Sequence, residues 1–172
     1  LHFKGKISEA IKYYKYCLNL GVNDHRIFAN YALILKDIGR LNEAEILTRK
    51  AIRINPKFVN AYYNLGSILI DLGKFKDAET YTRKAIEINP NEPNLHQKLG
   101  IILMELGKQK EAEISLRRAI KINPNDPILY QSLAIILIEL NKAKEAEITL
   151  YKSININPNI IKNYYLLSTF SL

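Results

Sequence analysis

The sequence predicts an all-α fold made of helix pairs that repeat every 34 residues. The dipeptide Asn-Pro occurs at 55/56, 89/90, 123/124 and 157/158, always with that spacing. The segments before it align, as in EAEILTRKAIRINP from Glu43 and EAEISLRRAIKINP from Glu111. Apolar residues inside each repeat recur at steps of three and four, which is the period of a helix. A fixed period of this length is typical of stacked helical repeats.

Four whole repeats and two fragments follow when each proline is placed at position 32. The repeats are 25–58, 59–92, 93–126 and 127–160. Residues 1–24 are predicted to be mainly the second helix of an earlier repeat, and 161–172 to be the start of a first helix. We expect a single repeat domain overall, taken from a longer array.

The first helix of each repeat is predicted to end at a glycine. Gly39, Gly73 and Gly107 occupy this position, and Asn141 replaces them in the fourth repeat. Glycine enters the left-handed conformation that closes a helix without a Cβ penalty, and asparagine is the next-best residue there.

The second helix is predicted to stop before a proline, which lacks an amide donor and clashes with the preceding turn. These prolines are Pro56, Pro90, Pro124 and Pro158. Small residues are expected where the two helices of a repeat approach: Ala32, Gly66, Gly100 and Ala134, facing Ala44, Ala78, Ala112 and Ala146.

Some positions depart from the pattern and are expected to weaken single contacts. His96 stands where other repeats have Phe28, Tyr62 and Tyr130. Ser153 and Cys17 stand where other repeats have alanine, and we interpret Cys17 as a small buried filler.

These features together resemble the tetratricopeptide repeat family over essentially the whole chain. The resemblance rests on the period, the start Tyr62, Leu65 and Gly66, the fixed alanine of the second helix and the terminal proline. It implies a right-handed superhelical solenoid of antiparallel helix pairs, whose first helices line a concave groove.

The resemblance also implies which residues face that groove. Amides can bind the backbone of an extended peptide, and aliphatic side chains can hold an apolar one. In the alternative interpretation, the isoleucines fill contacts between adjacent first helices and the asparagines only face solvent. The predicted groove residues are Arg26, Asn30, Lys36, Asn60, Tyr63, Asn64, Ser67, Ile70, Asn94, Gln97, Lys98, Ile101, Met104, Gln131, Ile135 and Ile138.

The resulting functional hypothesis is a protein–protein interaction scaffold that binds a peptide or protein segment. Asn30 and Asn64 are similar to the asparagine ladder of the array attached to O-linked N-acetylglucosamine transferase, and Lys98 breaks that ladder. The chaperone-tail type of array carries Lys and Asn at positions 5 and 9, where this chain has Ala29 and Leu33 in its first repeat. We therefore predict no carboxylate clamp.

Two alternatives stay open. The chain can be the accessory or substrate-recruiting array of a larger bacterial glycosyltransferase, sulfotransferase or methyltransferase. It can also self-associate as a homo-oligomer through terminal helices with exposed apolar residues: Ile7, Ile11, Tyr14, Tyr164, Leu167 and Phe170.

Charge and composition favour a protein partner over nucleic acid or membrane. The net charge is +8, but its excess lies near the N-terminal end, and Glu45, Glu79 and Glu113 each precede an arginine by four residues. Such pairs typically describe a solvated helix face. No apolar run is long enough to span a membrane. The single cysteine favours a reducing compartment, so a cytoplasmic location is expected.

No catalytic constellation is predicted, and neither is a cofactor or a metal site. His2, His25 and His96 lack the spacing of metal ligands. The glycines fall at helix ends and crossings instead of forming a phosphate-binding loop. We expect this chain not to be an enzyme, while a catalytic domain outside it stays open.

Overall fold

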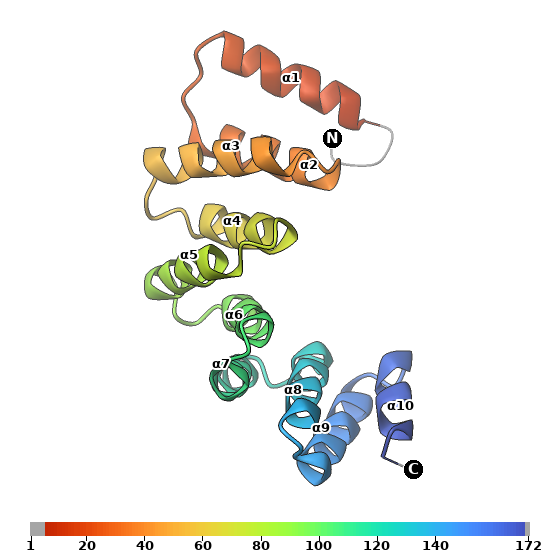
Figure 1. Ribbon diagram of the computed structural model, residues 1–172. Coiled ribbons are helices and arrows are strands. Elements are labelled where there is room, and N and C mark those ends of the chain that lie inside the picture. Colours follow the sequence, from red (N-terminus) through yellow and green to blue (C-terminus); the bar gives the residue numbers. More distant parts are fainter. Residues whose placement is uncertain (1–5, 171–172) are drawn as a thin grey trace. The chain divides into compact units, whose positions relative to one another are not determined.

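A computed structural model describes residues 6–170, which form ten α-helices (Figure 1). Their bounds are α1 Ile7–Asn19, α2 His25–Asp37, α3 Leu41–Ile54, α4 Val59–Asp71, α5 Phe75–Ile88, α6 Pro93–Glu105, α7 Gln109–Ile122, α8 Pro127–Glu139, α9 Ala143–Ile156 and α10 Ile161–Ser168. The chain divides after Ile88 into two compact units. The N-terminal unit holds α1 to α5, and the C-terminal unit holds α6 to α10.

Consecutive helices pack as antiparallel pairs in both units. In the N-terminal unit α2 packs on α3 and α4 on α5, and α4 also contacts both α2 and α3. The C-terminal unit repeats this arrangement with α6 to α9, and α10 packs on α9. The predicted all-α class and the helix pairing are confirmed. The single repeat domain expected from the sequence stays a prediction.

The predicted helix ends are confirmed. The backbone at Gly39, Gly73 and Gly107 has a positive φ of 79, 70 and 70°, and Asn141 adopts 57°. In each case the next amide reaches back over the helix end, as Lys142 N does to Leu137 O at 2.8 Å. This is the bonding pattern that satisfies the last carbonyl groups of a helix.

Helix pairs approach closely at the predicted small residues. A Cβ added to Gly100 on α6 would lie 2.9 Å from Leu116 Cγ and 3.4 Å from the Ala112 carbonyl oxygen on α7. Real Cβ atoms do not come this close, so a side chain at this position would force Leu116 to shift. Ala112 itself is fully buried, as are the equivalent Ala44, Ala78 and Ala146.

A repeated hydrogen bond fixes the start of three first helices. Tyr62 and Tyr130 each donate a hydroxyl to the carbonyl of Pro56 and Pro124, at 3.0 Å in both cases. His96 makes the same bond from Nε2 to the Pro90 carbonyl at 2.8 Å, and it is buried. Because a carbonyl only accepts, Nε2 carries the proton here. His96 therefore keeps the bond that the tyrosines make.

Ser153 does not weaken its contacts as the sequence suggested. Its hydroxyl donates to the Pro127 carbonyl at 2.7 Å and accepts from Asn163 Nδ2 at 2.8 Å. Asn163 Oδ1 in turn accepts from Gln131 Nε2 at 2.8 Å. Ser153 and Asn163 are both fully buried. We call Ser153, Asn163, Gln131 and the Pro127 carbonyl the polar network, and it connects α10 to α8 and α9.

Cys17 is half-buried, so its interpretation as a small buried filler is wrong. The equivalent alanines Ala51, Ala85 and Ala119 are all fully buried. They lie in helices that belong to complete pairs, whereas Cys17 lies in α1, whose residues Ile11, Tyr14 and Leu18 pack on the core of α2 and α3.

Glutamates on the second helices bridge successive pairs, which the sequence reading missed. Glu45 on α3 binds Arg49 at 2.8 Å on its own helix and Lys74 at 2.7 Å before α5. Glu113 on α7 binds Arg117 at 2.8 Å and Lys142 at 2.7 Å before α9. Glu113 is buried, so this is a contact between helix pairs and not a solvated surface pair.

These bridges predict a dependence of stability on pH. Burial would raise the pKa of Glu113, but its bonds to Lys142 and Arg117 outweigh burial and lower that pKa. The same balance with Lys74 and Arg49 lowers the pKa of Glu45. A carboxyl whose folded pKa is lowered stabilises the fold above its unfolded pKa of about 4.3, and this contribution disappears as pH falls through the folded value.

Glu113→Gln is therefore expected to lower the free energy of unfolding by about 1 kcal/mol at pH 7, because charge-assisted bonds become neutral ones. The difference from the unmodified chain should shrink below about pH 4. Urea unfolding followed by circular dichroism at pH 7 and pH 3 measures both values. Glu139→Gln, at an exposed site at the end of α8, is the control. An equal loss at both pH values would contradict the assignment.

Candidate functional site

The first helices of the N-terminal unit, α2 and α4, form one wall. They contact each other directly, and Lys36 on α2 lies 3.0 Å from Asp71 on α4. Along this wall Asn60 and Tyr63 are exposed, and three further predicted residues of α4 are half-buried: Asn64, Ser67 and Ile70. We call this surface the N-terminal wall.

Two predicted groove residues of α2 already have partners within this unit. Arg26 binds Asp24 at 2.6 Å, and Asp24 accepts the Arg26 amide at the start of α2 at 2.8 Å. Side-chain and backbone hydrogen bonds from Arg26 lower the pKa of Asp24 to about 2. Burial raises the pKa of the Tyr14 hydroxyl on α1, and the nearby Asn30 side chain opposes this with a smaller, lowering effect. A peptide would have to compete with these contacts at the start of the wall.

The first helices α6 and α8 form the corresponding C-terminal wall. Gln97 Nε2 on α6 donates to Ser132 Oγ on α8 at 3.3 Å, and Gln131 on α8 reaches Asn163 on α10. Asn94 and Ile101 are exposed, and the other predicted residues of this wall are half-buried: Lys98, Met104, Ile135 and Ile138.

None of the predicted groove residues is buried, and the structure brings them together on two separate walls. Their assignment to a peptide-binding site stays a prediction. Gln97 and Gln131 also serve contacts between neighbouring first helices. Since these bonds use the amide NH₂ groups, the carbonyl oxygen of Gln97 is left to accept from a ligand.

Exposure of the terminal helices differs from the expectation. Ile7, Ile11 and Tyr14 are half-buried, because α1 packs on α2 and Tyr14 stacks on Tyr31 with ring centroids 5.6 Å apart. On α10, Tyr164 is 48% exposed, as expected. Leu167 and Phe170 are half-buried, whereas Ile161 and Tyr165 are more exposed, at 83% and 70%.

The sequence reading also missed a furrow between successive second helices in each unit. The N-terminal furrow, between α3 and α5, holds a cavity of about 410 Å³ lined by Ile46, Arg49, Ile52, Arg53 and Tyr81. The C-terminal furrow, between α7 and α9, holds one of about 460 Å³ over α8, lined by Arg117, Ile120, Lys121, Tyr130, Leu133, Glu145, Ile148, Thr149 and Lys152. A signal for both furrows was present in the sequence, because Ile46 and Ile148, which line the two cavities, each follow a Glu-Ala-Glu segment and are exposed.

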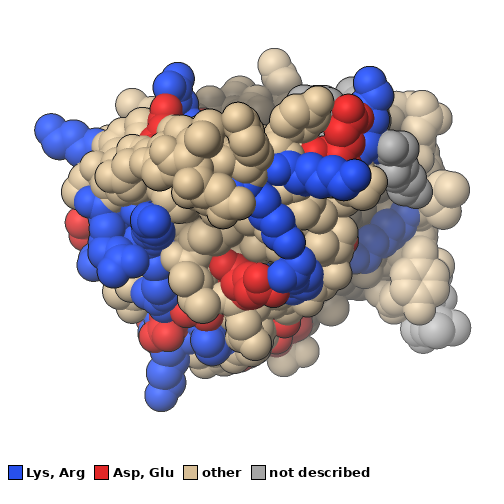
Figure 2. Space-filling model, turned by 90° about the horizontal axis from the view of Figure 1, so that it is seen from above, with Lys and Arg blue, Asp and Glu red and all other residues tan. Residues whose placement is uncertain are grey.

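The distribution of charges, histidines and apolar helices bears on other kinds of site. On the face shown in Figure 2, acidic groups lie among the basic ones instead of leaving a continuous basic surface. His25 contacts Asn55 at 3.2 Å and packs on Phe58, and His2 lies outside the described residues. Within residues 6–170, no group of three His, Cys, Asp or Glu side chains is placed to hold a metal. No helix in that range has the length and apolarity needed to cross a bilayer.

Comparison with protein families gives the identity of the fold. Family models described as tetratricopeptide repeat match residues 25–58, 59–92, 93–126 and 115–148. Together they cover most of the chain. The chain is a tetratricopeptide repeat protein. Arrays of this family act as scaffolds for protein–protein interaction, and they are typically non-catalytic.

Solved structures of tetratricopeptide repeat proteins share this fold. MamA aligns with a TM-score of 0.84 at 24% identity, covering 92% of this chain and 93% of its own. TTC0263, a thermophilic protein from Thermus thermophilus, aligns at 0.78 and 20% identity, covering 98% and 92%. YrrB, described as a TPR protein with an unusual peptide-binding site, aligns at 0.75 and 22%, covering 91% and 80%. At these identities the likeness concerns the fold alone.

No curated protein matches the sequence significantly. These comparisons give no support to the resemblance to the transferase-attached arrays.

Proposed function

We propose that this tetratricopeptide repeat chain binds an extended segment of another polypeptide on its first-helix walls. The observation that carries the proposal is the placement of the predicted residues. All of them keep some exposure, and within each unit they lie on adjacent first helices that contact each other.

The chemistry of the two walls suits different groups of a peptide. The N-terminal wall offers Asn60 and Asn64, whose amides can donate to a peptide carbonyl and accept from a peptide amide. The C-terminal wall offers Ile101, 41% exposed, beside half-buried Met104, Ile135 and Ile138. An apolar side chain of the ligand can cover these aliphatic groups, which favours binding through burial of apolar area. The peptide-binding site named for YrrB supports the same class of ligand.

The test is a variant that carries Asn64→Glu and Met104→Glu together. We expect it to lose capture of the partner from native cell extract, because each wall then presents a carboxylate where an amide or thioether was needed. Isothermal titration with the captured and identified partner should show affinity reduced by about a hundredfold, which is about 2.7 kcal/mol. Helical content should not change, since neither residue is fully buried.

The matched control is Thr80→Glu with Ile114→Glu. It makes the same change of net charge on exposed positions of the second helices α5 and α7. If the control loses capture and the wall variant keeps it, the site does not lie on the first helices.

Attachment to a transferase and self-association stay predictions. The full open reading frame decides the first, because a catalytic domain would follow the array. Light scattering over a range of concentrations decides the second. A mass that rises with concentration, and that returns to the monomer value in Ile161→Lys/Tyr165→Lys, would place the contact on exposed α10.

A further inference from the structure

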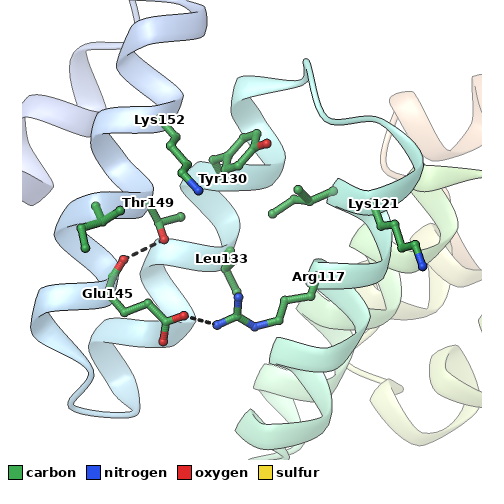
Figure 3. A pocket seen from close by; sticks show the side chains of 9 residues that line it. Arg117, Lys121, Tyr130, Leu133, Glu145, Thr149 and Lys152 are labelled. Atoms are coloured by element: carbon green, nitrogen blue, oxygen red, sulfur yellow. Dashed lines mark hydrogen bonds and ion pairs between the residues drawn. The ribbon is translucent and has the colours of Figure 1, made fainter.

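We propose that the C-terminal furrow is a second binding site, which takes an acidic peptide segment with a short apolar centre. This site lies between the second helices α7 and α9, so it is distinct from the first-helix walls of the proposed function (Figure 3).

The floor of the furrow is apolar. The apolar lining residues come from all three helices: Ile120 from α7, Tyr130 and Leu133 from α8, and Ile148 from α9. Ile148 is 58% exposed, although large aliphatic side chains on a helix gain free energy by burial. A volume of about 460 Å³ lies within the range of pockets that hold small ligands or single side chains.

The rim of the furrow is positively charged. Its one acidic lining residue, Glu145, is paired with Arg117, which also binds Glu113. Lys121 and Lys152 stand on opposite sides of the cavity, on α7 and α9, and both are exposed (Figure 3). The lining therefore carries an excess of positive charge around an apolar floor. Carboxylates that flank an apolar side chain complement this arrangement.

The N-terminal furrow supports the same reading. Arg49, Ile52 and Arg53 occupy the positions that Arg117, Ile120 and Lys121 occupy two repeats later. There, however, Tyr81 fills the position of Thr149, and the Arg49 guanidinium lies 4.9 Å from its ring centroid and bonds its hydroxyl. Tyr81 thus covers part of the N-terminal furrow, whereas the smaller Thr149 leaves the floor of the C-terminal furrow open.

The test uses a fluorescein-labelled peptide, Asp-Glu-Leu-Phe-Asp-Glu, and fluorescence anisotropy at low salt. We expect saturable binding that weakens as salt is added, because exposed charges are screened. A peptide with Lys at each acidic position should not bind, and one with Ser at the two apolar positions should bind about tenfold more weakly.

Lys121→Glu with Lys152→Glu should weaken binding about tenfold or more. Lys144→Glu with Lys162→Glu makes the same change of net charge at exposed positions that do not line the cavity, and it should stay within about twofold. All four lysines are exposed, so the variants should fold, which circular dichroism checks.

Methyl NMR then locates the peptide. Shifts should appear at Ile120 and Ile148, and they should be absent at Ile101 and Ile135 of the C-terminal wall. The wall variant Asn64→Glu/Met104→Glu should bind this peptide as the unmodified chain does, so this test and that of the proposed function can fail independently. Absence of binding, equal binding of the Lys-containing peptide, or shifts confined to Ile101 and Ile135 would each overturn the proposal.

Discussion

Gly100→Leu is expected to lower the free energy of unfolding of the C-terminal unit by about 3 kcal/mol, near the upper end for overpacked cores. Even a Cβ at this position would lie 2.9 Å from Leu116 Cγ and 3.4 Å from the Ala112 carbonyl oxygen. The backbone of α7 cannot move away without opening the α6–α7 pair. Urea unfolding monitored by circular dichroism, with the slope compared to that of the unmodified chain, measures the loss.

A paired variant shows that the effect comes from this crossing. Gly100→Ala alone should cost about 1 to 2 kcal/mol, since Leu116 must shift. Combined with Leu116→Thr it should cost less, because the third repeat then reproduces the first, where Ala32 and Thr48 occupy the same positions and are both fully buried. Equal losses for the single and the combined variant would show that Leu116 is not the obstacle.

Ser153→Ala is expected to lower the free energy of unfolding by about 2 kcal/mol. The serine hydroxyl is the partner of Asn163 Nδ2, and both residues are fully buried. Alanine leaves that amide without its bond, and a buried unsatisfied donor costs its desolvation free energy. The α10 helix should therefore detach first, which hydrogen exchange of its amides would show as lost protection.

The chain itself supplies the compensating change. At the equivalent positions of an earlier junction, Ala119 and Leu129 are both fully buried. Ser153→Ala with Asn163→Leu should then recover most of the stability that either substitution loses alone, because the polar pair is replaced as a whole. Strictly additive losses in this double-mutant cycle would mean that the two side chains do not act together.

The fold could be predicted from local signals. Gly107 and Asn141 close helices through their own backbone conformation, and Pro124 blocks the turn before it, so each signal acts within a few residues of its position. The period then fixes the stacking of neighbouring repeats, because a single helix pair cannot bury its apolar side alone. Apolar residues at steps of three and four predict that the segments between these signals are helices.

Contacts between repeats were harder to predict. The sequence predicts that Glu113 pairs with Arg117, four residues later, but gives no local sign of its second partner Lys142, which is 29 residues later. A signal existed, since Glu45 and Lys74 have the same separation. It carries meaning only once Lys142, which precedes α9, is known to lie beside α7. The polar network was missed for a similar reason, because Ser153 was interpreted as a single departure from the pattern and its partner Asn163 lies in the next segment.

The candidate site was predicted in part. The first-helix residues follow from position within the repeat, and none of them proved to be buried. Their existing partners could not be predicted, since Arg26 binds Asp24, which precedes its helix, and Lys36 binds Asp71 on the next first helix. The furrows depend on the separation of α3 from α5 and of α7 from α9, which side-chain size at Tyr81 and Thr149 modifies.

The polar network makes the repeats of this chain non-interchangeable despite their shared period. Ser153 in the second helix of the fourth repeat pairs with Asn163 in the next first helix, whereas Ala119 in the third repeat requires an apolar residue such as Leu129 at the equivalent position. A recombination that exchanged one repeat for another would therefore place a hydroxyl against a leucine, or an amide against a methyl group. Recombination between such arrays therefore preserves packing only when a whole repeat is exchanged together with the start of the repeat that follows it.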